Sequence, residues 1–313
     1  MLKGDELRNL SKPSGWHSTA SIALDWALIT GAFALAIKFP SPAVCAFSFL
    51  ILSRQQLALA ILMHDGAHRR FYVSHKLNDW VCQLTCAAPL FFSMYSYQKL
   101  HLKHHREPLA ADDPDLSLIG GYPISKGSFL RKIARDATGV SYFKFIRYFI
   151  HMARKPRVEK FKKEENEMGL SELKSQGSGK GLSLPVLIAT ILAVNFALWL
   201  ALFLLGHGWF YLFLWVLPAI TALQVLLRIR GIAEHAGYQP GPDQSRNART
   251  VLPSLQTWIF APHNVNFHIE HHLYPSVPFF RLKELHALLN ERGSIPASNV
   301  YGGYGRVISE LVK

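Results

Sequence analysis

Four apolar stretches, each about as long as a membrane-spanning helix, constrain this chain more than any other feature of its sequence. They lie at residues 20–39, 42–63, 184–205 and 209–227. A helix of about 20 apolar residues crosses the roughly 30 Å hydrocarbon core of a bilayer. Because only a few residues separate the two members of each pair, the spacing predicts two tight helical hairpins. We therefore expect an all-α integral membrane protein.

Basic residues flank the apolar stretches and indicate how the chain is oriented. The 313-residue chain has a formal net charge of +13 and a hydrophobic fraction of 50%, an unusual combination for one soluble domain. Lysine and arginine precede the first stretch, fill residues 98–183 and follow the last stretch at Arg228 and Arg230. Since cytoplasmic loops are rich in these residues, we expect both termini and the segments 98–183 and 228–313 in the cytoplasm. Charge beside membrane segments favours a lipid surface over nucleic acid.

One further apolar segment, residues 80–97, is interrupted by Pro89 and carries scattered polar groups. A full crossing would place the histidine-rich segments on its two sides in opposite compartments, so we predict a re-entrant or interfacial helix. Residues 154–181 are highly charged and end in a Gly/Ser run, which predicts a solvated helix and a flexible linker. Residues 1–313 are thus expected to form one domain, with a cytoplasmic helical cap that carries the functional site.

Asp25 and Arg54 are charged side chains deep within the first two stretches. They lie 15 and 14 residues from the turn at Pro40, so an antiparallel hairpin places them at similar depth. An unpaired charge in lipid is costly, which leads to the hypothesis that they form an ion pair. The alternative is that each faces a wet protein interior separately.

Nine of the fifteen histidines lie in four clusters. Rings four residues apart share one face of a helix, whereas adjacent rings diverge by about 100° around it. Adjacent histidines therefore suit two neighbouring metal ions, and nine nitrogen ligands are too many for one. Imidazole binds zinc, copper, iron and nickel, so ligand type alone leaves the metal open. The clusters are His64-Asp-Gly-Ala-His68, His101-Leu-Lys-His104-His105, Glu234-His235 and His268-Ile-Glu-His271-His272.

The motifs HDGAH, HLKHH and HIEHH, with their intervals and the paired hairpins, resemble those of the membrane fatty acid desaturase superfamily over about residues 40–290. The resemblance implies a di-iron centre, holding two iron ions, and an O2-dependent desaturase that introduces a C=C bond into a fatty acyl chain of a lipid or thioester. It implies an external electron donor such as ferredoxin or cytochrome b5, because no flavin or nicotinamide Gly-rich motif is visible. The implied ligands are His64, His68, His101, His104, His105, His235, His268, His271 and His272.

Polar residues beside the clusters are candidates for supporting the ligands. Asp65, Glu234 and Glu270 could hold imidazole N–H groups in the metal-binding tautomer, with simple solvation as the alternative. Asn264 and Asn266 could hold a water at the metal or cap a loop.

The acidic run after the second cluster, ADDPD, contains Asp112, Asp113 and Asp115. Turn chemistry is favoured there over contact with the ligand rings. No metal role is expected for the histidines outside the clusters, which are His17, His75, His151, His207, His263 and His286.

Two other functions remain open at this point. A lipid or carotenoid hydroxylase or ketolase of the same superfamily would share the metals and add oxygen to carbon. A non-catalytic histidine-rich transporter or zinc-site membrane receptor comes from another class. Transport would place ligands along a path through the bilayer, whereas these clusters lie beyond the helix ends on one side.

Overall fold

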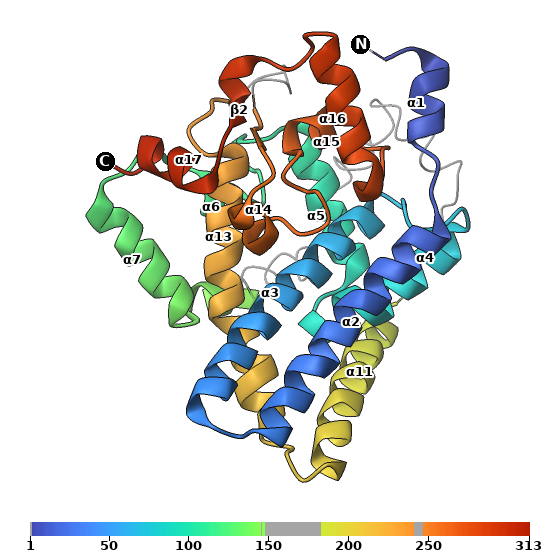
Figure 1. Ribbon diagram of the computed structural model, residues 1–313, viewed down its shortest axis with the longest axis vertical. Coiled ribbons are helices and arrows are strands. Elements are labelled where there is room, and N and C mark those ends of the chain that lie inside the picture. Colours follow the sequence, from blue (N-terminus) through green and yellow to red (C-terminus); the bar gives the residue numbers. More distant parts are fainter. Residues whose placement is uncertain (1, 145, 148–182, 241–246) are drawn as a thin grey trace.

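The computed structural model describes residues 2–144, 146–147, 183–240 and 247–313. Long helices run along its longest axis, and shorter helices gather at one end of them (Figure 1). The described residues are mostly helical, with one two-stranded parallel sheet. The mostly helical fold is therefore as predicted, while the solvated helix and linker expected at 154–181 lie outside the described residues.

The first hairpin consists of α2 (Gly15–Lys38) and α3 (Pro42–Ala67). Helix α3 begins where the Ser41 hydroxyl accepts a hydrogen bond from the backbone N–H of Val44 at 3.3 Å, and Pro42 suits the first helical position because it needs no N–H there. The two helices are also joined by a bond from the Ser48 hydroxyl to the Ala32 carbonyl at 3.0 Å.

The second hairpin pairs α11 (Leu184–Leu204) with a run broken into η3 (Tyr211–Val216), α12 (Leu217–Ile220) and α13 (Ala222–His235). Pro218 lacks an N–H for the helical ladder, and the backbone leaves helical geometry at Thr221, which accounts for the break. Four helical segments of the described residues are long and apolar enough to cross a membrane, as the sequence predicts. They are Gly4–Lys38, Pro42–Ala67, Pro185–Leu204 and Tyr211–His235.

The segment around Pro89 forms a helix that ends early and turns back. Helix α4 (His75–Cys82) continues through η1 (Gln83–Ala87) and η2 (Ala88–Leu90), and α5 (Met94–Arg106) follows after a turn at Phe91, which has a φ of 63°. This segment is not among the candidate spans found in the described residues.

Two side chains from the second hairpin satisfy the carbonyls at this early helix end. Asn195 Nδ2 donates to the Ala88 carbonyl at 2.7 Å, and Trp215 Nε1 donates to the Pro89 carbonyl at 3.0 Å. Irregular backbone is tolerated at membrane depth only where protein groups bond it. These contacts support the re-entrant or interfacial helix, whose membrane position stays a prediction.

Asp25 and Arg54, the charged residues within the first hairpin, contact other polar groups as well as each other. Arg54 Nη1 lies 4.0 Å from Asp25 Oδ1, so the predicted pair forms at the limit of an ion pair. Asp25 has nearer partners in His263 Nε2, at 2.7 Å, and Gln55 Nε2, at 2.9 Å. The ion-pair hypothesis was thus incomplete, because a loop distant in sequence supplies the closest contact.

The short helices and the small sheet at one end of the molecule form a cap over the ends of α3 and α13 (Figure 1). The strand β1 (Thr250–Val251) pairs with β2 (Val300–Tyr301), and buried Phe267, Val277 and Leu285 pack α15 (His268–Leu273) against α16 (Leu282–Glu291). This packing holds the third histidine motif over the two long helices (Figure 1). The other short elements are α1 (Gly4–Leu10), α6 (Leu116–Ile119), α7 (Lys126–Ala137), α14 (Leu255–Phe260), η5 (Phe279–Arg281), η6 (Ala297–Asn299) and α17 (Tyr304–Leu311).

Candidate metal centre

All nine histidines of the four clusters meet where α3, α5, α13 and α15 come together. His64 lies on the last turn of α3, and His68 is the residue that follows that helix. His235 is the last residue of α13. Helix α5 carries His101, His104 and His105, and α15 carries His268, His271 and His272.

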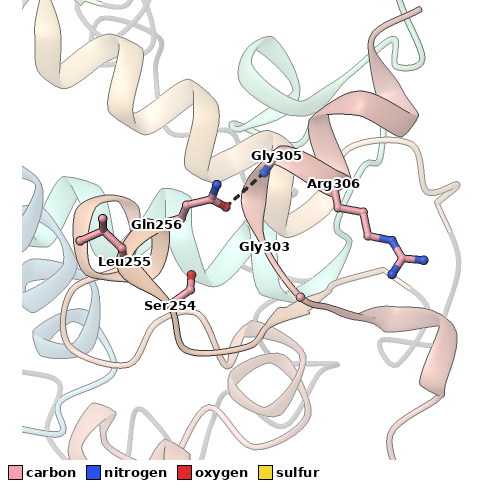
Figure 2. Close-up of a pocket in the computed structure, with 7 residues that line it drawn as sticks. Ser254, Leu255, Gln256, Gly303, Gly305 and Arg306 are labelled. Atoms are coloured by element: carbon pink, nitrogen blue, oxygen red, sulfur yellow. Dashed lines mark hydrogen bonds between the residues drawn. The ribbon is translucent and has the colours of Figure 1, made fainter.

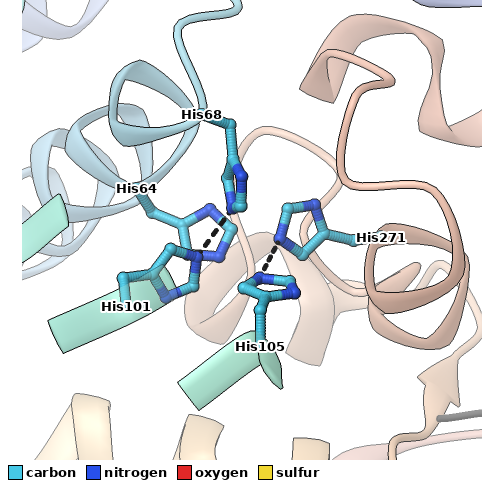
Figure 3. A group of neighbouring side chains, drawn as sticks. All are labelled: His64, His68, His101, His105 and His271. Atoms are coloured by element: carbon cyan, nitrogen blue, oxygen red, sulfur yellow. Dashed lines mark hydrogen bonds between the residues drawn. The ribbon is translucent and has the colours of Figure 1, made fainter. Parts of the chain in front are cut away.

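Five of the rings form one group, in which one nitrogen of each lies within 4.8 Å of the others. Figure 3 shows these rings facing a common centre from α3, α5 and α15. His68 Nε2 lies 2.8 Å from His101 Nε2, and His271 Nε2 lies 2.9 Å from His105 Nε2. The five-histidine group is His64, His68, His101, His105 and His271.

The other four rings form a second group centred on His235. Its Nε2 lies 3.2 Å from His104 Nε2 and 2.8 Å from His268 Nε2. The ring of His272 lies 4.6 Å from that of His235, measured between centroids. The four-histidine group is therefore His104, His235, His268 and His272.

Adjacent histidines are divided between the two groups. His104 and His105 go to different groups, and so do His271 and His272. This is the arrangement expected from the roughly 100° that separates consecutive helical residues. Rings four residues apart, such as His101 and His105, stay together.

The hydrogen bonds of His104 and His235 indicate bare nitrogens that face each other. His104 Nδ1 donates to both carboxylate oxygens of Asp113 at 3.0 Å, and His235 Nδ1 donates to the Asn247 carbonyl at 2.7 Å. If each neutral ring carries its proton on Nδ1, the tautomer inferred from these bonds, its Nε2 presents a lone pair. Two lone pairs 3.2 Å apart repel unless a proton on one of the nitrogens or a metal ion lies between them. Two ligand nitrogens each about 2.1 Å from one ion lie about 3 Å apart at near-perpendicular bond angles, so this geometry fits a bound metal.

The five-histidine group contains a second sign of an ion. The Nε2 atom of His64 is buried and has no hydrogen-bond partner among the described residues. A buried polar atom without a partner costs free energy that a metal–nitrogen bond would offset. Both groups therefore have ring nitrogens whose positions fit a bound metal ion.

Burial keeps most of the rings outside the spans neutral. It lowers the pKa of His68 to about 3, and it lowers the pKa values of His101, His105, His268, His271 and His272 well below 6.5. Neutral imidazole is the form that binds a metal.

His104 is the exception. Burial acts to lower its pKa, but the hydrogen bond to Asp113 and the charge of Asp115 raise the pKa above its ordinary value. The bonds that His104 and the backbone N–H groups of Leu109 and Asp115 donate to Asp113 keep the pKa of that carboxyl low, although burial opposes this. An anionic Asp113 stabilises positive charge on the ring, whether from a proton or from a metal ion.

Among the residues suggested to support the ligands, Glu234 lies near one of the nine clustered rings, that of His268. Its Oε1 atom is 3.6 Å from His268 Nδ1 and accepts a hydrogen bond from Arg230 Nε at 2.6 Å. Asp65 instead accepts from the backbone N–H of Phe279 at 3.1 Å.

The other three suggested residues bond groups outside the nine rings. Asn264 Nδ2 donates to the Phe279 carbonyl at 3.2 Å, and Asn266 Nδ2 donates to the Val251 carbonyl at 2.8 Å. Glu270 accepts hydrogen bonds from Thr250 and from His286, and so joins α15 to β1 and α16.

Two residues that hold the ligand rings were not expected from the sequence. Asp113 was assigned to turn chemistry, and Asn247 was missed. Asp113 does the turn chemistry expected of it, since it accepts from backbone N–H groups, and it also holds His104. Its signal was the spacing of nine residues from a ligand, which is weak alone. The Asn247 carbonyl carried no signal, because every residue has one. His151 lies outside the described residues.

The sequence is similar to those of several known proteins. The family model for "Fatty acid desaturase" matches residues 40–300. A beta-carotene ketolase from Paracoccus sp. (strain PC1) is 26% identical over 89% of this chain and 92% of its own length. An sn-1 acyl-lipid omega-3 desaturase (ferredoxin) from Synechocystis sp. is 23% identical over 89% and 77%. A dihydrorhizobitoxine desaturase from Bradyrhizobium elkanii is 24% identical over 93% and 81%.

Proposed function

Because the chain belongs to the fatty acid desaturase family, we propose that it is an O2-dependent di-iron lipid desaturase that introduces a C=C bond into a fatty acyl chain. The observation that carries the proposal is the gathering of nine histidines from four chain segments. Five form one group, and the other four are joined through His235. Each group would hold one iron ion. The named relatives are all oxidative enzymes, which supports an oxidoreductase.

When bound, the two irons would supply dioxygen activation and removal of hydrogen from an unactivated C–H bond. The protein's own residues would hold and orient the ligand rings. Asp113 and the Asn247 carbonyl fix the tautomers of His104 and His235, which leaves Nε2 of each ring free for the metal. Seven of the nine histidines are buried, and His68 and His105 are partly buried, which would limit the access of water to the centre.

The site would face the cytoplasm. The distribution of lysine and arginine supports this orientation, and an external donor such as ferredoxin or cytochrome b5 would supply electrons there. A net charge of +13 favours an acidic donor, because complementary charge accelerates association. Turnover that does not change with ionic strength would argue against electrostatic docking.

A ketolase or hydroxylase acting on a carotenoid or lipid is the second candidate. The similarity to a beta-carotene ketolase over 92% of that protein's length favours it. The two functions differ in the product. Desaturation removes two hydrogens, a hydroxylase inserts oxygen into a C–H bond, and a ketolase replaces two hydrogens on one carbon with oxygen.

The test is expression in a host that makes both membrane lipids and carotenoids, followed by mass spectrometry of both pools. We expect acyl chains lighter by two hydrogens with the wild-type chain and no change with His104→Ala. The matched control is His75→Ala, a histidine outside both groups, which should retain the product. Products that gain an oxygen and lose two hydrogens would support the ketolase, and products that gain an oxygen alone would support the hydroxylase. Metal analysis should give about two iron ions per chain, one per histidine group, whereas about one zinc and no iron would favour the non-catalytic alternative.

A further inference from the structure

Two segments expected in the cytoplasm expose large apolar side chains beside the membrane-spanning helices. In and after α7, Leu130 and Phe143 are 64% and 63% exposed. In α14, Leu255 and Trp258 are 75% and 55% exposed. Single exposed apolar residues are ordinary. The depth of these segments along the long helices therefore decides whether the side chains reach the bilayer.

Contacts with α13 show that α7 descends along the fourth candidate span. Arg228 Nη2 donates to Asp136 Oδ1 at 3.1 Å, and both side chains are buried. Farther along, Gly139 has a φ of 77° and approaches Ile220 so closely that a Cβ atom would lie 3.2 Å from the Ile220 carbonyl oxygen. Arg228 and Ile220 lie 7 and 15 residues before His235, or about 10 and 22 Å along a helix.

Contacts with α3 place α14 at a similar depth. The Trp258 carbonyl accepts from Arg54 Nε at 3.3 Å, and the Arg54 guanidinium lies 5.0 Å from the Trp258 ring centroid. Arg54 lies 10 residues before His64, or about 15 Å along the helix. Helix α14 is also held to α17, since Gln256 Oε1 accepts from the Gly305 N–H at 3.3 Å beside the hollow in Figure 2, which Leu255 also lines. Both segments therefore reach well below the metal centre towards the bilayer.

The charges of α7 match an anionic lipid surface. Lys126, Arg131 and Arg135 are exposed, and the acidic residue of this helix, Asp136, is already paired with Arg228. A basic helix with an apolar face lies in the membrane interface and is attracted to anionic headgroups.

We propose that α7, with the chain after it to Phe143, and α14 are lipid-facing elements inserted in the bilayer leaflet on the metal-centre side, with the basic residues of α7 binding anionic headgroups. Lipid is the occupant because the exposed apolar side chains adjoin candidate spans on α3 and α13, and the exposed charges of α7 are basic. The proposal does not depend on the reaction catalysed.

Site-directed spin labelling of the full chain in nanodiscs tests insertion. Single cysteines would replace Leu130, Leu255 and, as a control on the exposed face of α16, Ala287. Cys45 would be changed to alanine, whereas Cys82 and Cys86 are buried. We expect labels at the first two positions to collide more with oxygen than with a water-soluble nickel chelate, and the control label to show the reverse. Nickel accessibility at Leu130 and Leu255 equal to that of the control would overturn insertion, and labels shielded from both reagents would overturn it in favour of a protein partner.

The headgroup preference is tested by depth measurements in two lipids. In an equimolar phosphatidylcholine–phosphatidylglycerol mixture, Arg131→Glu with Arg135→Glu should make the Leu130 label shallower. In phosphatidylcholine alone the same change should have a smaller effect. An equal effect in both lipids would overturn the anionic preference and leave insertion to be judged by the first experiment.

Discussion

The two histidine groups lie side by side, yet they are held in different ways. The five-histidine group consists of imidazoles alone, with two from α5 and two from the end of α3. The four-histidine group adjoins acidic residues, because Asp113 bonds His104 and Glu234 lies near His268. Regular helix spacing thus orients the first group, whereas hydrogen bonds from outside the motifs orient the second.

This difference has an electrostatic consequence. Burial lowers the pKa values of His68, His101, His105 and His271, so these rings are neutral. An ion in the five-histidine group would be stabilised by ring dipoles, with no carboxylate in that group. In the four-histidine group, the carboxylate of Asp113 opposes that charge directly. We expect changes outside the ligands to affect the second group more strongly.

The largest effect should come from removing a ligand from either group. His271→Ala and His235→Ala should each lower turnover by more than about 100-fold. Mutating a group that only hydrogen-bonds a ligand already lowers metal affinity or activity by about 10- to 100-fold. Turnover and iron content of the purified protein check this. If His235→Ala retained both activity and iron, the four-histidine group would not hold an ion.

Asp113→Asn should weaken metal binding at the four-histidine group by about 10- to 100-fold. The amide cannot provide the negative charge that stabilises a metal-bound His104. Chelator competition measures the loss, and Asp112→Asn is the control because that carboxylate is exposed and pairs with Lys103 at 2.5 Å. Loss of both ions in equal measure would contradict the separate support of the two groups.

Glu234→Gln should have a smaller effect, of less than about 10-fold on metal affinity. The carboxylate lies 3.6 Å from His268 Nδ1 and is already bonded to Arg230, so its hold on the ring is weaker than that of Asp113. The same chelator competition measures it. A loss larger than that of Asp113→Asn would reverse the ranking.

The smallest effects should appear in the pH dependence of the metal-free protein, where the groups differ in sign. His68 has a folded pKa of about 3 against 6.5, so its contribution to stability is present above about pH 6.5 and lost as the pH falls towards 3. His104 has a raised pKa, so its contribution is present below pH 6.5 and lost as the pH rises through the folded value. Thermal unfolding should therefore show less acid sensitivity in His68→Gln and more in His104→Gln. Changes in the same direction would contradict the comparison.

Much of the fold could be predicted because the signals for it are local. The lengths of the four apolar stretches do not depend on tertiary contacts, and helices cover most of each stretch in the structure. The segment around Pro89 was harder, since its carbonyls find partners in Asn195 and Trp215, more than 100 residues away. The partner of Asp25 was missed for the same reason, because His263 is 238 residues distant.

The sequence by itself determined which histidines gather and that adjacent ones diverge, because helix geometry relates residues one and four positions apart whatever surrounds them. Only the tertiary structure decided how nine rings divide into five and four, and which acidic residues reach them. The distances between the rings depend on how α3, α5, α13 and α15 pack. These helices are far apart in the sequence, so local chain geometry does not fix their relative positions.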